Sequence, residues 1–115
     1  MPAGRPVLYW DMDIRQASDS LEALGNPTRL EIFRLLVQAG EEGAPVGQVQ
    51  KALGIPASTL SHHIARLLRV GLVTQQRRSR LLICRANYEA MNDLLGFLTD
   101  NCCGGIQWGD QPSVA

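Results

Sequence analysis

Apolar residues recur at helical spacing in five segments of the chain, and glycine or proline separates most of these segments. The second segment shows the boundary signals most clearly, because Asn26 is a favoured N-cap residue, Pro27 suits the first helical position, and Gly40 suits the end. The five helices are therefore predicted over residues 13–24, 26–39, 46–53, 57–70 and 87–101.

Two short runs near the end of the chain have the pattern of strands. They are LVTQQR (72–77) and LLICRA (81–86), and the polar residues between them predict a hairpin tip. The third and fourth helices are joined by a short turn containing glycine, which is the helix-turn-helix arrangement, whereas the EEGAP segment before them is interpreted as a simple turn. The predicted fold is mostly α with a β-hairpin wing, a winged helix-turn-helix. The chain is predicted to consist of an N-terminal arm (1–12), one domain (13–103) and a flexible tail (104–115).

The length and composition agree with one small globular domain. The chain has 115 residues, of which 45% are hydrophobic. No apolar run is long enough to span a membrane and the first residues do not resemble a signal peptide, so we expect a cytoplasmic location. Three cysteines do not make a disulfide framework and are expected to be free thiols or ligands.

The charges are distributed unevenly although their sum is zero. No acidic residue lies between Glu42 and Glu89. All eleven acidic residues are these two or lie outside this stretch, towards either end of the chain. The stretch between them contains seven basic residues and both histidines: Lys51, Arg66, Arg69, Arg77, Arg78, Arg80, Arg85, His62 and His63. This pattern is expected of a protein that presents one face to nucleic acid, although an ordinary solvated basic surface would also produce it.

Two segments resemble the ArsR family of metalloregulatory repressors. They are LEALGNPTRLEIFRLL (21–36) and ALGIPASTLSHHIARLLRVGLV (52–73), which a basic hairpin follows. The resemblance extends over roughly residues 13–103. It implies a homodimer with two-fold symmetry built on the first and last helices, and binding to double-stranded operator DNA that an inducer releases.

The fourth helix and the wing carry the predicted DNA contacts. Small polar and basic side chains near the start of a reading helix can reach base edges, and arginines at a hairpin tip can reach phosphates or the minor groove. The candidate residues are Ser58, Thr59, Ser61, His62, His63, Arg66, Arg77, Arg78 and Arg80. Ser58 can also cap the helix, and His63, which lies beside the apolar face, is equally well explained as a half-buried structural histidine.

The cysteines are the candidate sensor. The segment GAPVGQV (43–49) lacks the cysteine pair that the family uses in this helix for arsenic or cadmium, and the last helix lacks the histidines of its zinc and nickel sites. Cys102 and Cys103 match a pair that some members use for trivalent arsenic, with Cys84 as a candidate third ligand. Trivalent arsenic with one organic group needs only two thiolates, whereas inorganic arsenite needs a third.

Alternatives to an arsenic sensor remain open at this point. Cys102 continues the apolar face of the last helix and can be a buried interface residue, and Cys84 is well explained by core packing. Redox or persulfide sensing by the same cysteines is a further alternative. No cofactor is expected apart from the inducer. The sequence has no catalytic motif, so we expect no enzyme, and a winged helix used only for protein contacts would be less polar on its outer helix face.

Overall fold

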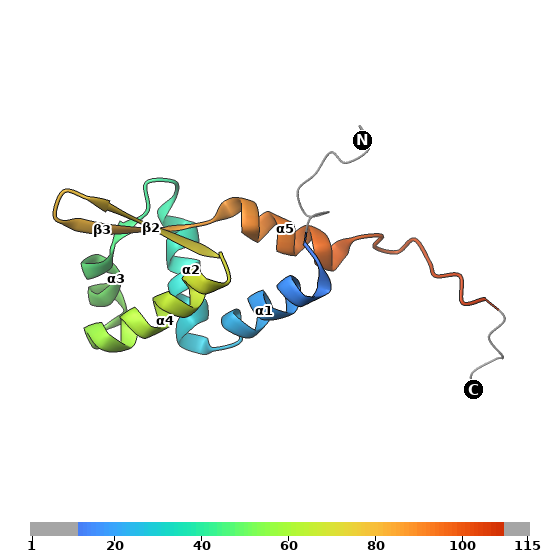
Figure 1. The fold of residues 1–115 in the computed structure, drawn as a ribbon, viewed down its shortest axis with the longest axis horizontal. Helices are drawn as coiled ribbons and strands as arrows, with labels where there is room; N and C mark the ends of the chain where they lie inside the picture. The colour runs from blue at the N-terminus through green and yellow to red at the C-terminus, as the bar shows by residue number, and fades with distance from the viewer. Residues whose placement is uncertain (1–11, 110–115) are drawn as a thin grey trace.

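The computed structural model describes residues 12–109, and the predicted arm and the end of the predicted tail lie largely outside this range. The chain forms five helices and three strands in the predicted order, with one addition. Their bounds are α1 (Ile14–Leu24), α2 (Pro27–Ala39), β1 (Ala44–Pro45), α3 (Val46–Leu53), α4 (Ala57–Arg69), β2 (Val73–Arg78), β3 (Leu81–Ala86) and α5 (Tyr88–Thr99). Figure 1 shows the hairpin of β2 and β3 at one end of the molecule and the end of α5 towards the other.

Side-chain caps explain where the first two helices begin. Asp13 and Gln16 form a capping box at the start of α1, in which each side chain bonds to the other residue's backbone N–H. Asn26 accepts a hydrogen bond from the backbone N–H of Arg29 at 3.1 Å, and Pro27 is the first residue of α2. The predicted break between these helices is confirmed.

The wing is a hairpin whose strands pair in an antiparallel register from Val73 opposite Ala86 to Arg78 opposite Leu81. The interpretation of residues 41–45 as a simple turn is wrong, because Ala44 and Pro45 form β1 and pair with Cys84 and Ile83. Two residues are too few to show an alternating pattern. Proline is also tolerated in a strand only at an edge, which is the place of β1 in the order β1-β3-β2.

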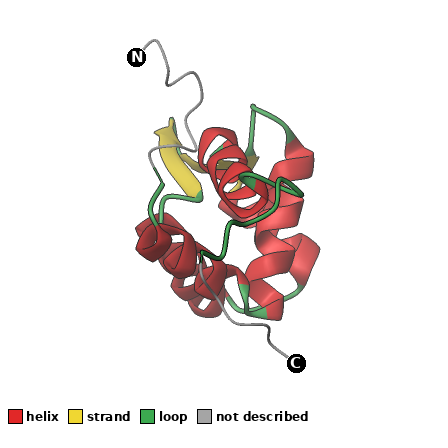
Figure 2. Cartoon of the chain, turned by 90° about the vertical axis from the view of Figure 1, so that its right-hand side faces the viewer, coloured by secondary structure: helices red, strands yellow, loops and turns green. Residues whose placement is uncertain are grey.

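The core lies between α2, α4 and the sheet, and its buried members extend along the chain from Ala23 to Ala86. Figure 2 shows the helices packed around one another with the sheet at their side. The largest fully buried side chains are Ile32, Leu36, Val49, Leu60, Leu67, Leu72, Val73 and Cys84. No helix within residues 12–109 is long and apolar enough to cross a membrane. The core therefore fixes α4 and the wing against a common frame.

Candidate nucleic-acid interface and thiol site

The start of α4 presents polar side chains to solvent. Helix α3 ends at Gly54 in the left-handed conformation (φ 65°), and Pro56 is the N-cap of α4. Leu60, Ile64 and Leu67 anchor the buried face of α4. The exposed side chains on the other faces include Ser58, Thr59, Ser61 and His62. Ser58 makes no cap hydrogen bond, so the prediction that it caps the helix is wrong, and its hydroxyl group has no hydrogen-bond partner within residues 12–109.

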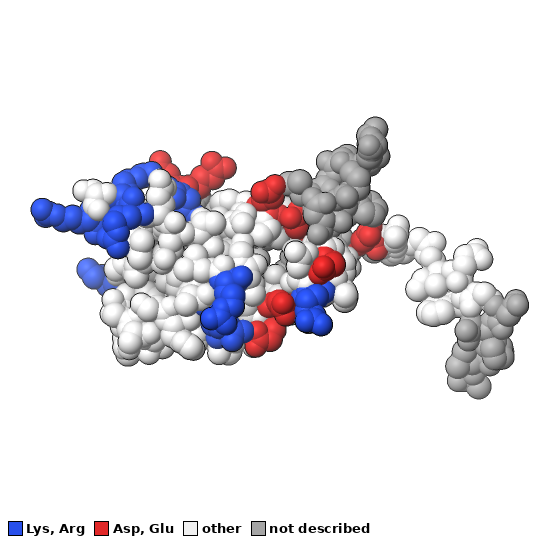
Figure 3. All heavy atoms as spheres, in the orientation of Figure 1, with Lys and Arg blue, Asp and Glu red and all other residues white. Residues whose placement is uncertain are grey.

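Three arginine side chains concentrate positive charge at the tip of the wing. Arg77, Arg78 and Arg80 are all exposed, and Ser79 between them adopts a positive φ of 59° at the tight turn. Figure 3 shows this basic cluster projecting from the wing end of the molecule. Arg85, in contrast, is held within the protein, because its guanidinium donates to the Glu41 carbonyl and to Gln76 Oε1. The wing tip can thus meet a phosphate backbone without giving up contacts within the protein.

Two of the predicted DNA contacts already have partners inside the protein. Arg66 Nη2 forms an ion pair with Glu22 Oε1 of α1. His63 Nδ1 lies 3.3 Å from Nη1 of Arg29, whose Nε donates at 2.6 Å to the carbonyl of Ala23. The structural interpretation of His63 as half-buried and hydrogen-bonded agrees with this arrangement. Arg66 and His63 therefore differ from the exposed candidate residues of α4, because their side chains already have partners within the protein.

The environment of His63 lowers its pKa below the ordinary value of 6.5. Partial burial is the largest cause, and the positive charge of Arg29 and the neighbouring His62 ring act in the same direction. A neutral imidazole accepts the hydrogen bond from Arg29, whereas an imidazolium cannot accept it.

This lowered pKa predicts a pH dependence of stability. Between the folded pKa of His63 and 6.5 the unfolded chain binds more protons, so the free energy of unfolding falls as the pH drops through this range. The variant His63→Asn keeps an acceptor near the Nδ1 position but does not titrate. We expect its thermal unfolding temperature to fall less than that of the wild type between pH 7.5 and 5.5, as followed by circular dichroism. Parallel curves for the two proteins would contradict this assignment.

Cys102 and Cys103 lie in a turn beyond α5. The helix ends at Thr99, earlier than predicted, and the backbone N–H of Cys102 donates to the Thr99 carbonyl at 2.9 Å. Asn101 and Cys103 have positive φ angles of 59° and 65°, and both thiols are exposed, with their sulfur atoms 3.2 Å apart. The prediction that Cys102 continues the apolar helix face is therefore wrong for this protomer, and the left-handed turn brings the two sulfurs together.

The thiols differ in their chemistry. The hydrogen bond between the pair raises the pKa of Cys102, with a smaller contribution from desolvation, so this thiol keeps its proton at neutral pH. Cys84 is completely buried in the sheet and burial raises its pKa, although the hydrogen bond from Gln75 opposes the shift. No group of three metal-binding side chains occurs within residues 12–109. Cys84 is thus buried whereas the other two thiols are exposed, and its role as a third ligand stays a prediction.

The partners of Arg66 and His63 were missed by sequence reasoning. Glu22 is 44 residues from Arg66 and Arg29 is 34 residues from His63, so no local spacing relates them. Both partners lie in the segment LEALGNPTR, whose resemblance to the family does not by itself show which residues it contacts. The only local signal was the position of His63 and Arg66 three residues apart on one side of the helix.

Comparison with known proteins places this geometry in a family. Residues 24–76 match the family profile described as a helix-turn-helix domain. The chain is 32% identical over 88 residues to the HTH-type transcriptional regulator YgaV of Escherichia coli, an alignment covering 76% of this chain and 87% of YgaV. It is 37% identical over 75 residues to the protein named "Putative arsenical resistance operon repressor ArsR" of Halobacterium salinarum, covering 65% of this chain and 53% of that one. The chain belongs to the ArsR family of transcriptional regulators.

The fold of this ArsR-family regulator also matches a solved structure. The homodimeric winged helix-turn-helix DNA-binding domain Mb0332 of Mycobacterium bovis has a TM-score of 0.60 and 25% identity, over 76% of this chain and 82% of that chain. The predicted fold class and family are confirmed. The individual DNA contacts and the role of the cysteines stay predictions.

Proposed function

We propose that this ArsR-family regulator is a cytoplasmic homodimeric repressor that trivalent arsenic releases from operator DNA. The observation that carries the proposal is the exposed pair of sulfur atoms, 3.2 Å apart, at the end of α5. Adjacent cysteines form a strained disulfide, because their Cα atoms are closer together than in most disulfides. Two neighbouring soft sulfur ligands suit a single thiophilic centre.

The exposed side chains of α4 and the wing provide two different kinds of DNA contact. His62 is exposed near the start of α4 and should meet base edges in the major groove, whereas Arg78 is exposed at the wing tip and should meet phosphates. Arg78→Ala should weaken binding to all operator variants by a similar factor. His62→Ala should change the order of preference among them, as a fluorescence anisotropy titration would measure. Equal losses across all sequences for His62→Ala would contradict its role in base recognition.

A second copy of the chain is the natural partner for the apolar side chains of α1 and α5. These helices contact each other, and Ile14, Leu21, Leu95 and Leu98 remain 42–73% exposed on them. Contiguous exposed apolar side chains mark interaction surfaces. The homodimeric Mb0332 domain supports the same assembly here. A dimer would place two α4 helices and two wings on one operator.

The number of thiols favours an arsenical with one organic group. Phenylarsine oxide has one carbon bond on arsenic and reacts with two thiols, forming two As–S bonds and releasing one water from its oxygen and the two thiol protons. Inorganic arsenite would use the same two thiols, losing two waters, and would retain one hydroxyl group unless a third thiol displaced it. Since Cys84 is buried in the sheet, the pair alone provides the sulfur ligands of each protomer.

Hydrogen bonds link the start of α5, at the opposite end of this helix from the thiols, to the segment that follows the reading helix. At the start of α5, the Asn87 backbone N–H donates to the Leu72 carbonyl and its side chain donates to the Gly71 carbonyl, both just after α4. Tyr88 donates from its hydroxyl group to the Val37 carbonyl at 2.8 Å. A shift of α5 on arsenical binding can therefore move α4. Coupling of this kind is typically about 1–3 kcal/mol, roughly 5- to 150-fold in affinity.

Mass spectrometry of the intact protein tests the thiol assignment directly. We expect one phenylarsine group per protomer on the wild type after reaction with stoichiometric phenylarsine oxide. The matched control Cys84→Ala should also bind one group, whereas Cys102→Ser and Cys103→Ser should not retain it through gel filtration. Retention by either serine variant would contradict the assignment of the pair as the ligand site.

A further inference from the structure

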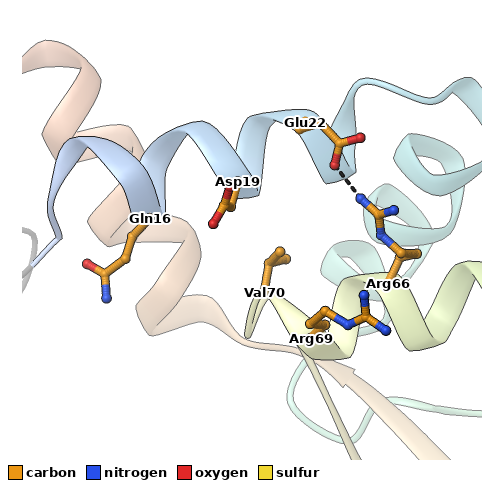
Figure 4. Close-up of a pocket in the computed structure, with 6 residues that line it drawn as sticks. All are labelled: Gln16, Asp19, Glu22, Arg66, Arg69 and Val70. Carbon is orange, nitrogen blue, oxygen red and sulfur yellow. Dashed lines mark hydrogen bonds and ion pairs between the residues drawn. The ribbon is translucent and has the colours of Figure 1, made fainter.

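Four side chains connect the end of α1 to one side of the reading helix. Arg66 pairs with Glu22, and Arg29 bridges the Ala23 carbonyl at 2.6 Å and His63 Nδ1 at 3.3 Å. Glu22 and Ala23 are neighbours in the last turn of α1, and His63 and Arg66 are three residues apart on α4. Figure 4 shows Glu22 reaching from α1 to Arg66 on α4 across the gap between the two helices. We call Glu22, Arg29, His63 and Arg66 the interhelix latch.

The two latch residues of α4 differ from the other polar residues of this helix in exposure and in partners, although helical spacing puts Thr59 and His62 on the same face as Arg66. Within residues 12–109 the side chains of Ser58, Thr59, Ser61 and His62 make no hydrogen bond, whereas those of His63 and Arg66 are half-buried and have partners. An arginine engaged by a carboxylate has less of its guanidinium available for a phosphate. The geometry therefore divides the predicted DNA contacts of α4 into groups that meet DNA and groups that hold the helix.

The energetics of the latch favour orientation over stability. The side chains of Glu22 and Arg66 are 64% and 32% exposed, and an exposed ion pair contributes little to the free energy of unfolding. Arg29 is more strongly committed, because its charged guanidinium donates to a carbonyl in the last turn of α1, where backbone acceptors lack helical partners. The ion pair of Glu22 with Arg66 and the bridge made by Arg29 together restrict the angle between α1 and α4.

We propose that the interhelix latch is a set of positioning residues that fixes the reading helix relative to α1, and so sets the spacing of the half-sites that the dimer recognises. This inference rests on the proposed function, in which α1 and α5 form the dimer interface and α4 enters the major groove. In such a dimer the distance between the two α4 helices depends on how each is held against its own α1. Dimeric helix-turn-helix proteins read half-sites at a defined separation for this reason.

The salt dependence of DNA binding distinguishes a latch residue from a phosphate contact. The slope of log affinity against log salt falls by about 0.9 for each phosphate contact that is lost. Arg78→Ala, at the wing tip, should reduce this slope. Arg66→Gln should leave it unchanged, because the Arg66 guanidinium is directed to Glu22 in the protein.

The test combines Glu22→Gln, Arg66→Gln and the double variant in one thermodynamic cycle. The probe is DNA upstream of the protein's own gene, in which footprinting locates the two half-sites. It is used with the native spacing and with one base pair added or removed between the half-sites. Each single variant should bind the native spacing about 3- to 10-fold more weakly and discriminate less between spacings. The double variant should bind no more weakly than either single variant, because both substitutions break the same link.

The matched control is Asp19→Asn, which removes one negative charge from α1. Asp19 lies one turn before Glu22 and faces the same gap between the helices. This variant should leave the spacing preference intact. The inference is overturned if Arg66→Gln lowers the salt slope while Glu22→Gln binds as well as or better than the wild type, because Arg66 would then be a phosphate contact. It is also overturned if all variants keep the wild-type spacing preference. Failure of the wild type to bind this DNA would contradict the proposed function as well.

Discussion

Replacing Leu98 by glutamate should convert the protein from a dimer to a monomer and lower its operator affinity about 100-fold or more. Leu98 is 53% exposed on α5, and Leu95, one turn earlier on the same helix, is also 53% exposed. A charge at this position would be desolvated without a partner in the dimer interface. Linking two DNA-binding modules commonly raises affinity by about 10² to 10⁴, and a monomer loses this gain.

Light scattering coupled to gel filtration measures the first effect, and fluorescence anisotropy measures the second. Leu81→Glu is the matched control for assembly, because Leu81 is 52% exposed but lies on the wing. It should retain the mass of a dimer. A Leu98→Glu protein that remains dimeric at micromolar concentration would show that this face of α5 is not the interface.

Substituting Gly43 by alanine should destabilise the fold by about 2–5 kcal/mol, with a fall in unfolding temperature of roughly 10 °C or more. Gly43 precedes β1 and has a φ of +74°, which side chains rarely adopt. An added Cβ would overlap the carbonyl oxygen of Cys84 and lie 2.7 Å from Cγ of Arg85. The loop would have to move away from β3, and the pairing of β1 with β3 would be lost.

Gly54→Ala provides the control for backbone strain alone. Gly54 is also left-handed, with a φ of +65°, but an added Cβ would meet no atom within 4 Å. Its cost should be limited to the left-handed conformation, about 1–2 kcal/mol. Calorimetry of both variants separates the two effects, and equal losses of stability would contradict the close approach of Gly43 to β3.

Local signals explain how much of the fold the sequence predicted. The helices α1 and α2 were predictable because Asn26, Pro27 and Gly25 act within a few residues of the boundary that they define. The wing was predictable because its two strands are adjacent in sequence and separated by a polar tip. The strand β1 was not, since its two residues become a strand only through pairing with β3, about 40 residues later.

The candidate sites also combine features that follow from nearby residues with features that depend on residues far apart in the sequence. The exposed polar start of α4 and the arginines of the wing follow from helical and strand periodicity. The thiol pair was visible as two adjacent cysteines, but the approach of their sulfurs depends on left-handed backbone at Asn101 and Cys103, which is uncommon for residues other than glycine. The contacts of Arg66 and His63 depend on helices packed together by the core.

An arsenical bound by Cys102 and Cys103 should release the regulator from DNA. The most direct measurement is the affinity of the reduced protein for DNA upstream of its own gene, with and without stoichiometric phenylarsine oxide, and then with arsenite. We expect phenylarsine oxide to weaken wild-type and Cys84→Ala binding about 5- to 150-fold, arsenite to act more weakly, and Cys102→Ser and Cys103→Ser to be unaffected. Tight wild-type binding that neither arsenical changes would contradict the claim.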